Sequence, residues 1–253
     1  MPWNGGKSVY EYMLDTRDSR GAGFFVLMDP DRVKLPDLVE QAKICAGSGV
    51  DVLLVGTSLM LGQGFTGTVK AIRDAVDIPV VIFPGEKSQV SECADALLFL
   101  TLLSGRNPDL IIGEQVRSAP MIKSIGLEAI STAYLLIESG RSTSVEFMSN
   151  TRPIPANKPD IALAHAMVAE LFGLKLVYLE AGSGAEHMVP DEMVKRVSED
   201  SALPVIVGGG IRSPRDVAAK VNAGASFVVV GNHLEDSDNH FDLQAFVNAA
   251  HNG

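Results

Sequence analysis

The fold is decided by an apolar strand that ends in a glycine-rich loop, Tyr178-Leu179-Glu180-Ala181-Gly182-Ser183-Gly184-Ala185. The apolar run begins at Leu176, stops at the acid Glu180 and then gives way to glycine and serine. Glycine lets a backbone approach a ligand closely and turn its N–H groups toward an anion. This stretch therefore predicts a strand whose end forms half of a phosphate-binding cradle.

Two later stretches have the same build, Val205-Ile206-Val207-Gly208-Gly209-Gly210-Ile211-Arg212 and Phe227-Val228-Val229-Val230-Gly231-Asn232. The first is followed by the residues of a helix start, Ser213-Pro214-Arg215-Asp216, with a capping serine, a proline and an acid. Three consecutive strands that end in glycine place backbone donors at one end of a parallel sheet. This is where an α/β barrel binds its ligands.

Composition limits the class of protein. The chain has 253 residues, of which 46% are hydrophobic, so it can bury a full core. A formal net charge of −10 opposes nucleic-acid binding, although backbone N–H groups can still bind a phosphorylated metabolite. The pattern of a signal peptide and the long apolar run of a membrane span are both absent, which predicts a cytoplasmic protein without a transmembrane segment. Cys45 and Cys93 have no metal-binding spacing.

The chain alternates between predicted strands and predicted helices. Apolar segments predict eight strands, at residues 24–28, 52–55, 80–83, 96–100, 129–137, 176–179, 205–207 and 227–230. Helical patterns include 35–46, 69–75, 109–125, 159–172 and 243–250, and a helix at 9–18 is expected to close the bottom of the fold. We therefore predict a single domain, residues 1–253, folded as a (β/α)8 TIM-type barrel. A doubly wound open sheet is the alternative.

Two connections depart from the regular alternation. Only about a dozen residues join the third and fourth strands, so the third outer helix is expected to be missing or replaced. The segment at residues 139–157 is long, polar and rich in Ser, Thr and Pro. A loop of this length in a compact domain is commonly functional, and we predict that it forms a lid over the site.

The chain resembles the geranylgeranylglyceryl phosphate synthases in three respects. These are the glycine motifs quoted above, the Asp29-Pro30 turn after the first strand and the helix at 158–170. These prenyltransferases of archaea and some bacteria join sn-glycerol 1-phosphate to geranylgeranyl diphosphate in ether-lipid synthesis. The resemblance implies a TIM-type barrel, dependence on Mg²⁺, and a homo-oligomer, either a dimer or a hexamer. It also implies a barrel without the third outer helix, in agreement with the short connection.

The resemblance further implies a set of site residues. The sn-glycerol 1-phosphate site falls on Tyr178, Leu179, Glu180, Ala181, Gly182, Ser183, Gly184, Gly209, Gly210, Gly231 and Asn232. The Mg²⁺ site falls on Asp29 and on a hydroxyl residue after the second strand, where alignment on Gly56 favours Ser58 over Thr57. Glu180 would act as general base and take the proton of the glycerol hydroxyl, while the metal neutralises the diphosphate.

Two other functions are compatible with the residues. An isomerase barrel would use Asp29 and Glu138 as acid and base and would need no magnesium. A phosphate- or flavin-binding barrel without prenyl chemistry would also suit the glycine-ended strands. The histidines have no zinc-type spacing and no lysine ends an apolar strand, so neither a zinc enzyme nor a Schiff-base aldolase is expected.

Overall fold

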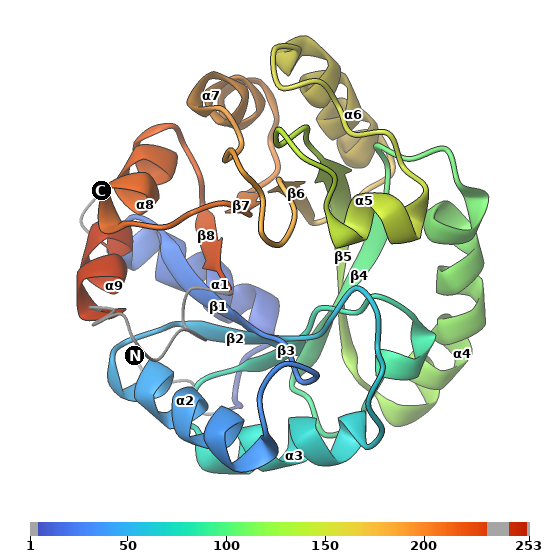
Figure 1. The fold of residues 1–253 in the computed structure, drawn as a ribbon, viewed down its shortest axis with the longest axis vertical. Coiled ribbons are helices and arrows are strands. Elements are labelled where there is room, and N and C mark those ends of the chain that lie inside the picture. Colours follow the sequence, from blue (N-terminus) through green and yellow to red (C-terminus); the bar gives the residue numbers. More distant parts are fainter. Residues whose placement is uncertain (1–4, 232–242, 252–253) are drawn as a thin grey trace.

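The structure is a computed structural model that describes residues 5–231 and 243–251 of the chain. Within these residues, eight parallel strands close into a barrel in sequence order, with the last strand paired to the first (Figure 1). They are β1 (Gly23–Met28), β2 (Val52–Val55), β3 (Val80–Ile82), β4 (Ala96–Leu102), β5 (Glu128–Leu136), β6 (Leu176–Glu180), β7 (Val205–Gly208) and β8 (Phe227–Val230). The predicted barrel is confirmed, and the open sheet is excluded.

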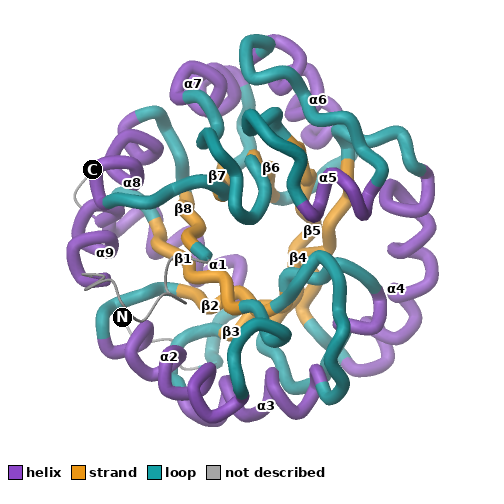
Figure 2. The backbone as a smooth tube through the Cα atoms, viewed as in Figure 1, coloured by secondary structure: helices purple, strands orange, loops and turns teal. Residues whose placement is uncertain are grey.

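Most of the helices form an outer ring around the strands, whereas α1 lies across one end of the barrel (Figure 2). In the described residues they are α1 (Val9–Arg20), α2 (Leu35–Gly47), α3 (Phe65–Ala75), α4 (Glu114–Ile125), α5 (Ser144–Ser149), α6 (Pro159–Leu171), α7 (Asp191–Asp200), α8 (Pro214–Asn222) and α9 (Leu243–His251). The connection from β3 to β4, all of which is described, contains only the 3₁₀ turn η1 (Lys87–Gln89). The third outer helix is therefore missing, as predicted. Of the helices described, none has the length and apolar character needed to span a bilayer.

The alternation of side chains along each strand produces two layers of core. On β6, Leu176 and Tyr178 point into the barrel, whereas Val177 and Leu179 pack outward against the helices. All four are fully buried, which explains why the strand is apolar on both faces. The same alternation directs Glu180, the last residue of β6, into the barrel at its carboxyl end.

Helix α1 closes the opposite end of the barrel, as predicted. The N–H groups of Val9 and Tyr10 donate to the carboxylate of Glu128, at the start of β5, at 2.6 and 3.1 Å. Ser8 caps the helix, and Met13 packs into the interior of the barrel. The amino ends of the strands are therefore covered, so the ligand-accessible space lies at the carboxyl ends.

Three features differ from the sequence prediction. Helix α3 begins at Phe65 rather than at residue 69, directly after Gly64, which has a left-handed backbone with φ of 86°. The segment 139–157 is not a structureless loop, because it contains helix α5. In addition, a strand-like bridge pairs Ile137 with Ile154 and so connects the two ends of much of the segment. Helix α7 has no counterpart in the prediction, although its buried apolar residues recur at helical spacing.

Candidate active site

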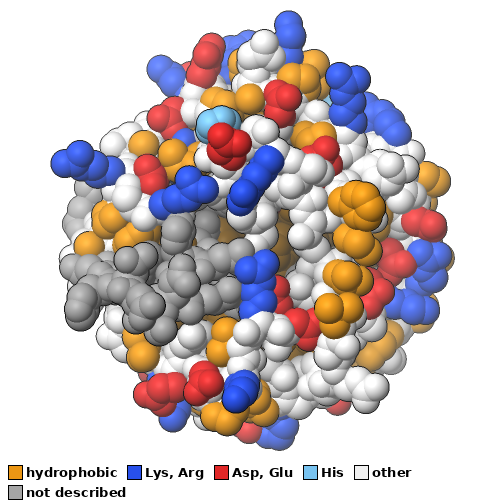
Figure 3. Space-filling model, in the orientation of Figure 1, with side chains coloured by type: hydrophobic (Ala, Val, Ile, Leu, Met, Phe, Trp, Pro, Cys, Tyr) orange, Lys and Arg blue, Asp and Glu red, His pale blue; other side chains and the backbone are white. Residues whose placement is uncertain are grey.

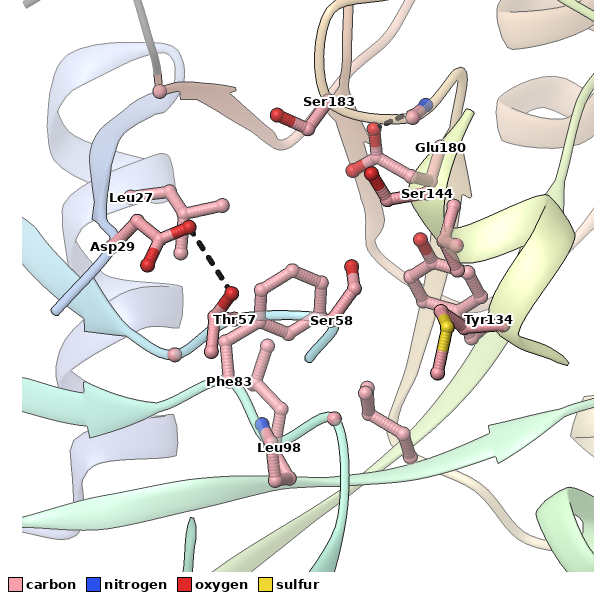
Figure 4. A pocket seen from close by; sticks show the side chains of 18 of the residues that line it. Leu27, Asp29, Thr57, Ser58, Phe83, Leu98, Tyr134, Ser144, Glu180 and Ser183 are labelled. Carbon is pink, nitrogen blue, oxygen red and sulfur yellow. Dashed lines mark hydrogen bonds between the residues drawn. The ribbon is translucent and has the colours of Figure 1, made fainter. Parts of the chain in front are cut away.

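A cavity of about 830 Å³ lies at the carboxyl ends of the strands. It is visible as a hollow in Figure 3, and Figure 4 shows its side chains from close by. Most of the predicted site residues line it, namely Asp29, Ser58, Tyr178, Glu180, Gly182, Ser183, Gly184, Gly209, Gly210 and Gly231. The barrel therefore brings the predicted metal and phosphate residues to a single cavity.

Two predicted residues support this cavity without facing it, and a third lies outside the described residues. Leu179 and Ala181 are fully buried in the layer between strands and helices. Ala181 donates its N–H to the Gly208 carbonyl at 3.0 Å, which holds the glycine loop against β7. Asn232 is the predicted residue that the structure does not describe.

Glu180 is the buried acid of the cavity, with 5% of its surface exposed. Its Oε1 accepts a hydrogen bond from the Gly182 N–H at 2.6 Å. Gly208 provides the space beside it, because a side-chain carbon there would lie 2.8 Å from Glu180 Oε2 and 2.6 Å from the Tyr178 hydroxyl. That hydroxyl is buried and lies beside the Glu180 carboxylate. The carboxylate and the phenol together form one polar corner of the cavity.

Burial sets the protonation of Glu180. Loss of hydration raises the pKa of Glu180 to about 7, although the Gly182 N–H and the nearby Tyr178 hydroxyl favour the charged form. Burial and the negative charge of Glu180 also raise the pKa values of Tyr178 and Tyr134 well above the usual value. A carboxyl group whose pKa lies near neutrality is suited to general acid–base catalysis. Glu180 is therefore the acid–base candidate of this cavity.

Glycine backbone surrounds the polar corner. Gly182, Gly184, Gly209 and Gly210 have φ values of +95°, +71°, +85° and +73°. A side-chain carbon at Gly209 would lie 2.5 Å from Glu180 Oε1, so the chain can pass here only as glycine. Helix α8 begins just beyond, and Ser213 caps it as predicted. These loops and the helix N-terminus have the build of a backbone cradle for an anion.

The other side of the cavity carries a carboxylate and two hydroxyls. Asp29 Oδ2 accepts a hydrogen bond from the Thr57 hydroxyl at 3.1 Å and forms an ion pair with Arg32 Nε at 3.2 Å. Ser58 also lines the cavity, but the described hydroxyl in contact with Asp29 is that of Thr57 (Figure 4). The described residues contain no cluster of three or more His, Cys, Asp or Glu that could hold a metal by itself. One carboxylate and a hydroxyl fit Mg²⁺, which commonly completes its shell with substrate phosphate and water.

Thr57 is fixed by a residue that sequence reasoning missed. Gln89, in η1, is fully buried, and its side-chain amide accepts the Thr57 N–H at 3.1 Å and donates to the Thr57 carbonyl at 2.8 Å. Gly85 allows the approach, because a side-chain carbon there would lie 2.3 Å from the Thr57 carbonyl oxygen. The turn that replaces the third outer helix therefore positions the hydroxyl beside Asp29. No local sequence pattern signals a contact over 32 positions.

Apolar side chains from β4 and two neighbouring helices line a further part of the cavity, which we call the apolar arm. Phe99 from β4, Leu110 from the π-helix η2 (Asp109–Gly113) and Met148 from α5 line this arm. Phe99 belongs to the outward-facing layer, which a third outer helix would otherwise cover. The sequence predicted the missing helix but gave no signal for the residues of the arm.

The segment 139–157 forms part of the cavity wall. Arg141 donates from Nε to the Gly184 carbonyl at 2.7 Å, and the Ser139 carbonyl accepts the N–H groups of Glu186 and His187. These bonds tie the segment to the glycine loop that follows β6. That it moves as a lid over bound substrates stays a prediction, which limited proteolysis with and without substrates would test.

The acid pair of the alternative isomerase is not brought together. Glu138 is exposed and accepts the Ala156 N–H at 3.3 Å. It does not line the cavity that contains Asp29. Among the described carboxylates of the barrel rim, Glu180 is the one that is buried beside the glycine cradle.

The fold and this site define a TIM-type barrel with a phosphate-binding face and a buried acid. The chain belongs to the PcrB family, which matches residues 15–250. The resemblance that the motifs indicated is thereby confirmed.

Relatives of the chain agree with this family in sequence and in structure. A geranylgeranylglyceryl phosphate synthase of Chitinophaga pinensis is 44% identical over 90% of each chain. The enzyme of the same name from Methanothermobacter thermautotrophicus is 43% identical over 84% of this chain and 86% of its own. A crystal structure of (S)-3-O-geranylgeranylglyceryl phosphate synthase from Thermoplasma acidophilum, in complex with its substrate sn-glycerol-1-phosphate, superimposes with a TM-score of 0.92 at 32% identity. It covers 98% of this chain and 100% of its own.

Proposed function

We propose that this chain is a prenyltransferase that forms an ether bond between sn-glycerol 1-phosphate and geranylgeranyl diphosphate and releases diphosphate. The observation that carries the proposal is the position of Glu180, a buried acid beside a glycine cradle in a cavity that also has an apolar arm. The names of its relatives support the same reaction.

The glycine cradle binds the phosphate of sn-glycerol 1-phosphate. Its backbone N–H groups and the N-terminus of α8 favour an anion without requiring a basic side chain. This arrangement suits a chain whose formal net charge is −10. A phosphate held here places the glycerol hydroxyls toward Glu180 and Tyr178, which lie in the adjoining corner.

Glu180 takes the proton of the attacking glycerol hydroxyl. As the bond between the allylic carbon and the diphosphate oxygen breaks, its electron pair leaves with the diphosphate. A lone pair of the glycerol oxygen then forms the ether bond, and the hydroxyl proton passes to Glu180. The Gly182 N–H, 2.6 Å from Oε1, keeps the carboxylate oriented toward the cavity.

Asp29 and a neighbouring hydroxyl hold Mg²⁺ in this proposal. Thr57 is the hydroxyl that contacts Asp29, and Ser58, the residue favoured by alignment, lines the same cavity. When bound, the metal neutralises the charge of the leaving diphosphate. Asp29 therefore marks the end of the cavity that receives the diphosphate, and Glu180 marks the end that receives the glycerol.

The apolar arm accepts the prenyl tail. Phe99, Leu110 and Met148 offer a hydrocarbon surface, and burial of a prenyl chain against it is favourable by roughly 25 cal/mol per Å². We further propose that the protein acts in the cytoplasm as a homo-oligomer, on the basis of the resemblance that the sequence motifs indicate.

The proposal is tested by incubating the protein with Mg²⁺, sn-glycerol 1-phosphate and prenyl diphosphates of several lengths. Mass spectrometry should identify a prenylglyceryl phosphate ether, formed best from the geranylgeranyl substrate. Formation of an isomerised sugar phosphate, or a yellow protein that binds flavin and makes no ether, would favour the alternatives.

A further inference from the structure

Phe83 is an aromatic residue that lines the cavity. It follows β3 directly, and its N–H donates to the Val55 carbonyl at 2.9 Å, so the backbone here continues the pairing with β2. Val81, two residues earlier, points into the barrel, and Phe83 packs against the same interior layer. Strand alternation therefore fixes the direction of the ring.

One side of the ring is covered by other aromatic rings. Tyr178 stacks on Phe83 with ring centroids 5.3 Å apart and planes inclined by 17°. Tyr134 packs beside it at 6.0 Å. Tyr178 is fully buried, whereas Phe83 is partly exposed and lines the cavity. The uncovered part of the Phe83 ring therefore borders the space in which substrates bind.

This space separates the two reacting ends of the site. Figure 4 shows the Phe83 ring between Asp29 and Thr57 on one side and Glu180 and Tyr134 on the other. In the proposed function, on which this inference rests, the diphosphate leaves toward Asp29 and the glycerol oxygen attacks from the side of Glu180. The allylic carbon must lie between them, next to the ring.

An aromatic ring is chemically suited to that place. The faces of aromatic rings are electron-rich and attract a cation, most strongly where water is excluded. A carboxylate in the same position would attract the charge too, but it could also attack the carbon and form an ester. Phe83 has no lone pair to donate and no proton to lose.

We propose that the face of the Phe83 ring stabilises the positive charge that develops on the allylic carbon as the diphosphate departs. The ring forms no bond. The electron pair of the broken carbon–oxygen bond leaves with the diphosphate, the glycerol oxygen supplies the pair of the new bond, and its proton goes to Glu180. Phe83 is thus a catalytic residue that acts only in the transition state.

Stepwise fluorination of the ring tests this role. Phe83 is replaced, in the full chain, by 4-fluoro-, 3,5-difluoro- and 3,4,5-trifluorophenylalanine, which keep the shape of the ring and withdraw electrons from its face. The single-turnover rate of ether formation should fall with each fluorine, by roughly 10- to 30-fold over the series, because a cation above a desolvated ring gains energy of this order. The KM for sn-glycerol 1-phosphate should stay constant.

Phe172 provides the control. It stands at the end of α6, is exposed and does not line the cavity. The same fluorinated residues at Phe172 should leave the rate unchanged. A flat series at Phe83, or an equal fall at both positions, would overturn the role of Phe83 while ether formation by the wild type still stood. Absence of any ether from the wild type would instead remove the proposed function itself, and this inference with it.

Discussion

Oε1 of Glu180 accepts the N–H of Gly182 at 2.6 Å, so the acid that faces the cavity is bonded to the first glycine of the loop that follows it. Glu180→Gln preserves an oxygen acceptor for this bond but removes the base. The variant should bind sn-glycerol 1-phosphate with little change in KM, while kcat falls by roughly 10²- to 10⁴-fold.

Steady-state kinetics of the wild type and of Glu180→Gln would measure these changes in kcat and KM. Glu186→Gln is the matched control, because Glu186 has an exposed side chain on the same loop, and its kcat should stay close to that of the wild type. A change confined to KM in Glu180→Gln would make Glu180 a glycerol-binding residue instead of the base.

The raised pKa of Glu180 also predicts how stability depends on pH. Burial raises the pKa of Glu180 to about 7 in the folded protein, whereas the pKa of this side chain in the unfolded chain is the ordinary 4.5. Because the folded state holds the proton more tightly between these values, the free energy of unfolding should decrease as pH rises through this window, by at most roughly 3 kcal/mol.

Thermal melting of the wild type and of Glu180→Gln between pH 4.5 and 8 checks this dependence. The variant cannot ionise, so its melting temperature should exceed that of the wild type increasingly as pH rises. A difference between the two proteins that is constant over this range would show that Glu180 does not carry the buried ionisation. The kcat of the wild type should increase over the same range as the base becomes ionised.

Gly231 offers a clean test of the phosphate cradle. A side-chain carbon there would meet Leu27 only at 3.7 Å, which is ordinary contact, and the residue has no positive φ. Gly231→Ala should therefore fold normally but narrow the cavity, and the KM for sn-glycerol 1-phosphate should rise roughly tenfold or more.

Two further glycine substitutions serve as comparisons for Gly231→Ala. Gly47→Ala, where nothing lies within 4 Å, should leave the KM unchanged. Gly209→Ala should raise the KM more than Gly231→Ala does, because the new side chain would press on Glu180 and the φ of Gly209 is +85°. An unaltered KM in Gly231→Ala would mean that the phosphate binds elsewhere.

Asp29 is the residue on which the proposed Mg²⁺ site depends. Asp29→Asn keeps an acceptor for the Asp31 N–H, so the turn after β1 should remain folded. It removes the only negative charge that the Asp29 and Thr57 pair offers to a cation. We expect turnover to be lost and Mg²⁺ binding, measured by calorimetry with an unreactive diphosphate analogue, to weaken.

Asp18→Asn, at an exposed position on α1, is the control for lost charge and should behave as the wild type. Full activity of Asp29→Asn, or full activity of the wild type in a strong chelator, would contradict the metal assignment.

The barrel could be predicted from the sequence because it depends on local patterns. The bounds of β2 and β8 agree with the prediction, since a strand covered on both faces is apolar at every position. The missing third helix followed from a connection that is too short to hold one. The polar segment 139–157 misled the prediction, because the short helix α5 within it buries few side chains and so has little apolar pattern.

The details of the site depend on residues that are far apart in the sequence. Alignment on Gly56 favoured Ser58, but the amide of Gln89 holds the backbone of Thr57, and the Thr57 hydroxyl contacts Asp29. The position of the Glu180 carboxylate likewise depends on Gly208 of the next strand, because a side-chain carbon there would lie 2.8 Å from Oε2. No pattern within one segment encodes either relationship.

Attack of a glycerol hydroxyl on the allylic carbon is tested most directly with sn-glycerol 1-phosphate that carries ¹⁸O in its primary hydroxyl. After incubation with geranylgeranyl diphosphate and Mg²⁺, mass spectrometry of both products locates the heavy oxygen. The ether should retain the label and the released diphosphate should contain none, because the bond that breaks joins the allylic carbon to the diphosphate oxygen. An ether without the label, or no ether at all, would contradict the proposed reaction.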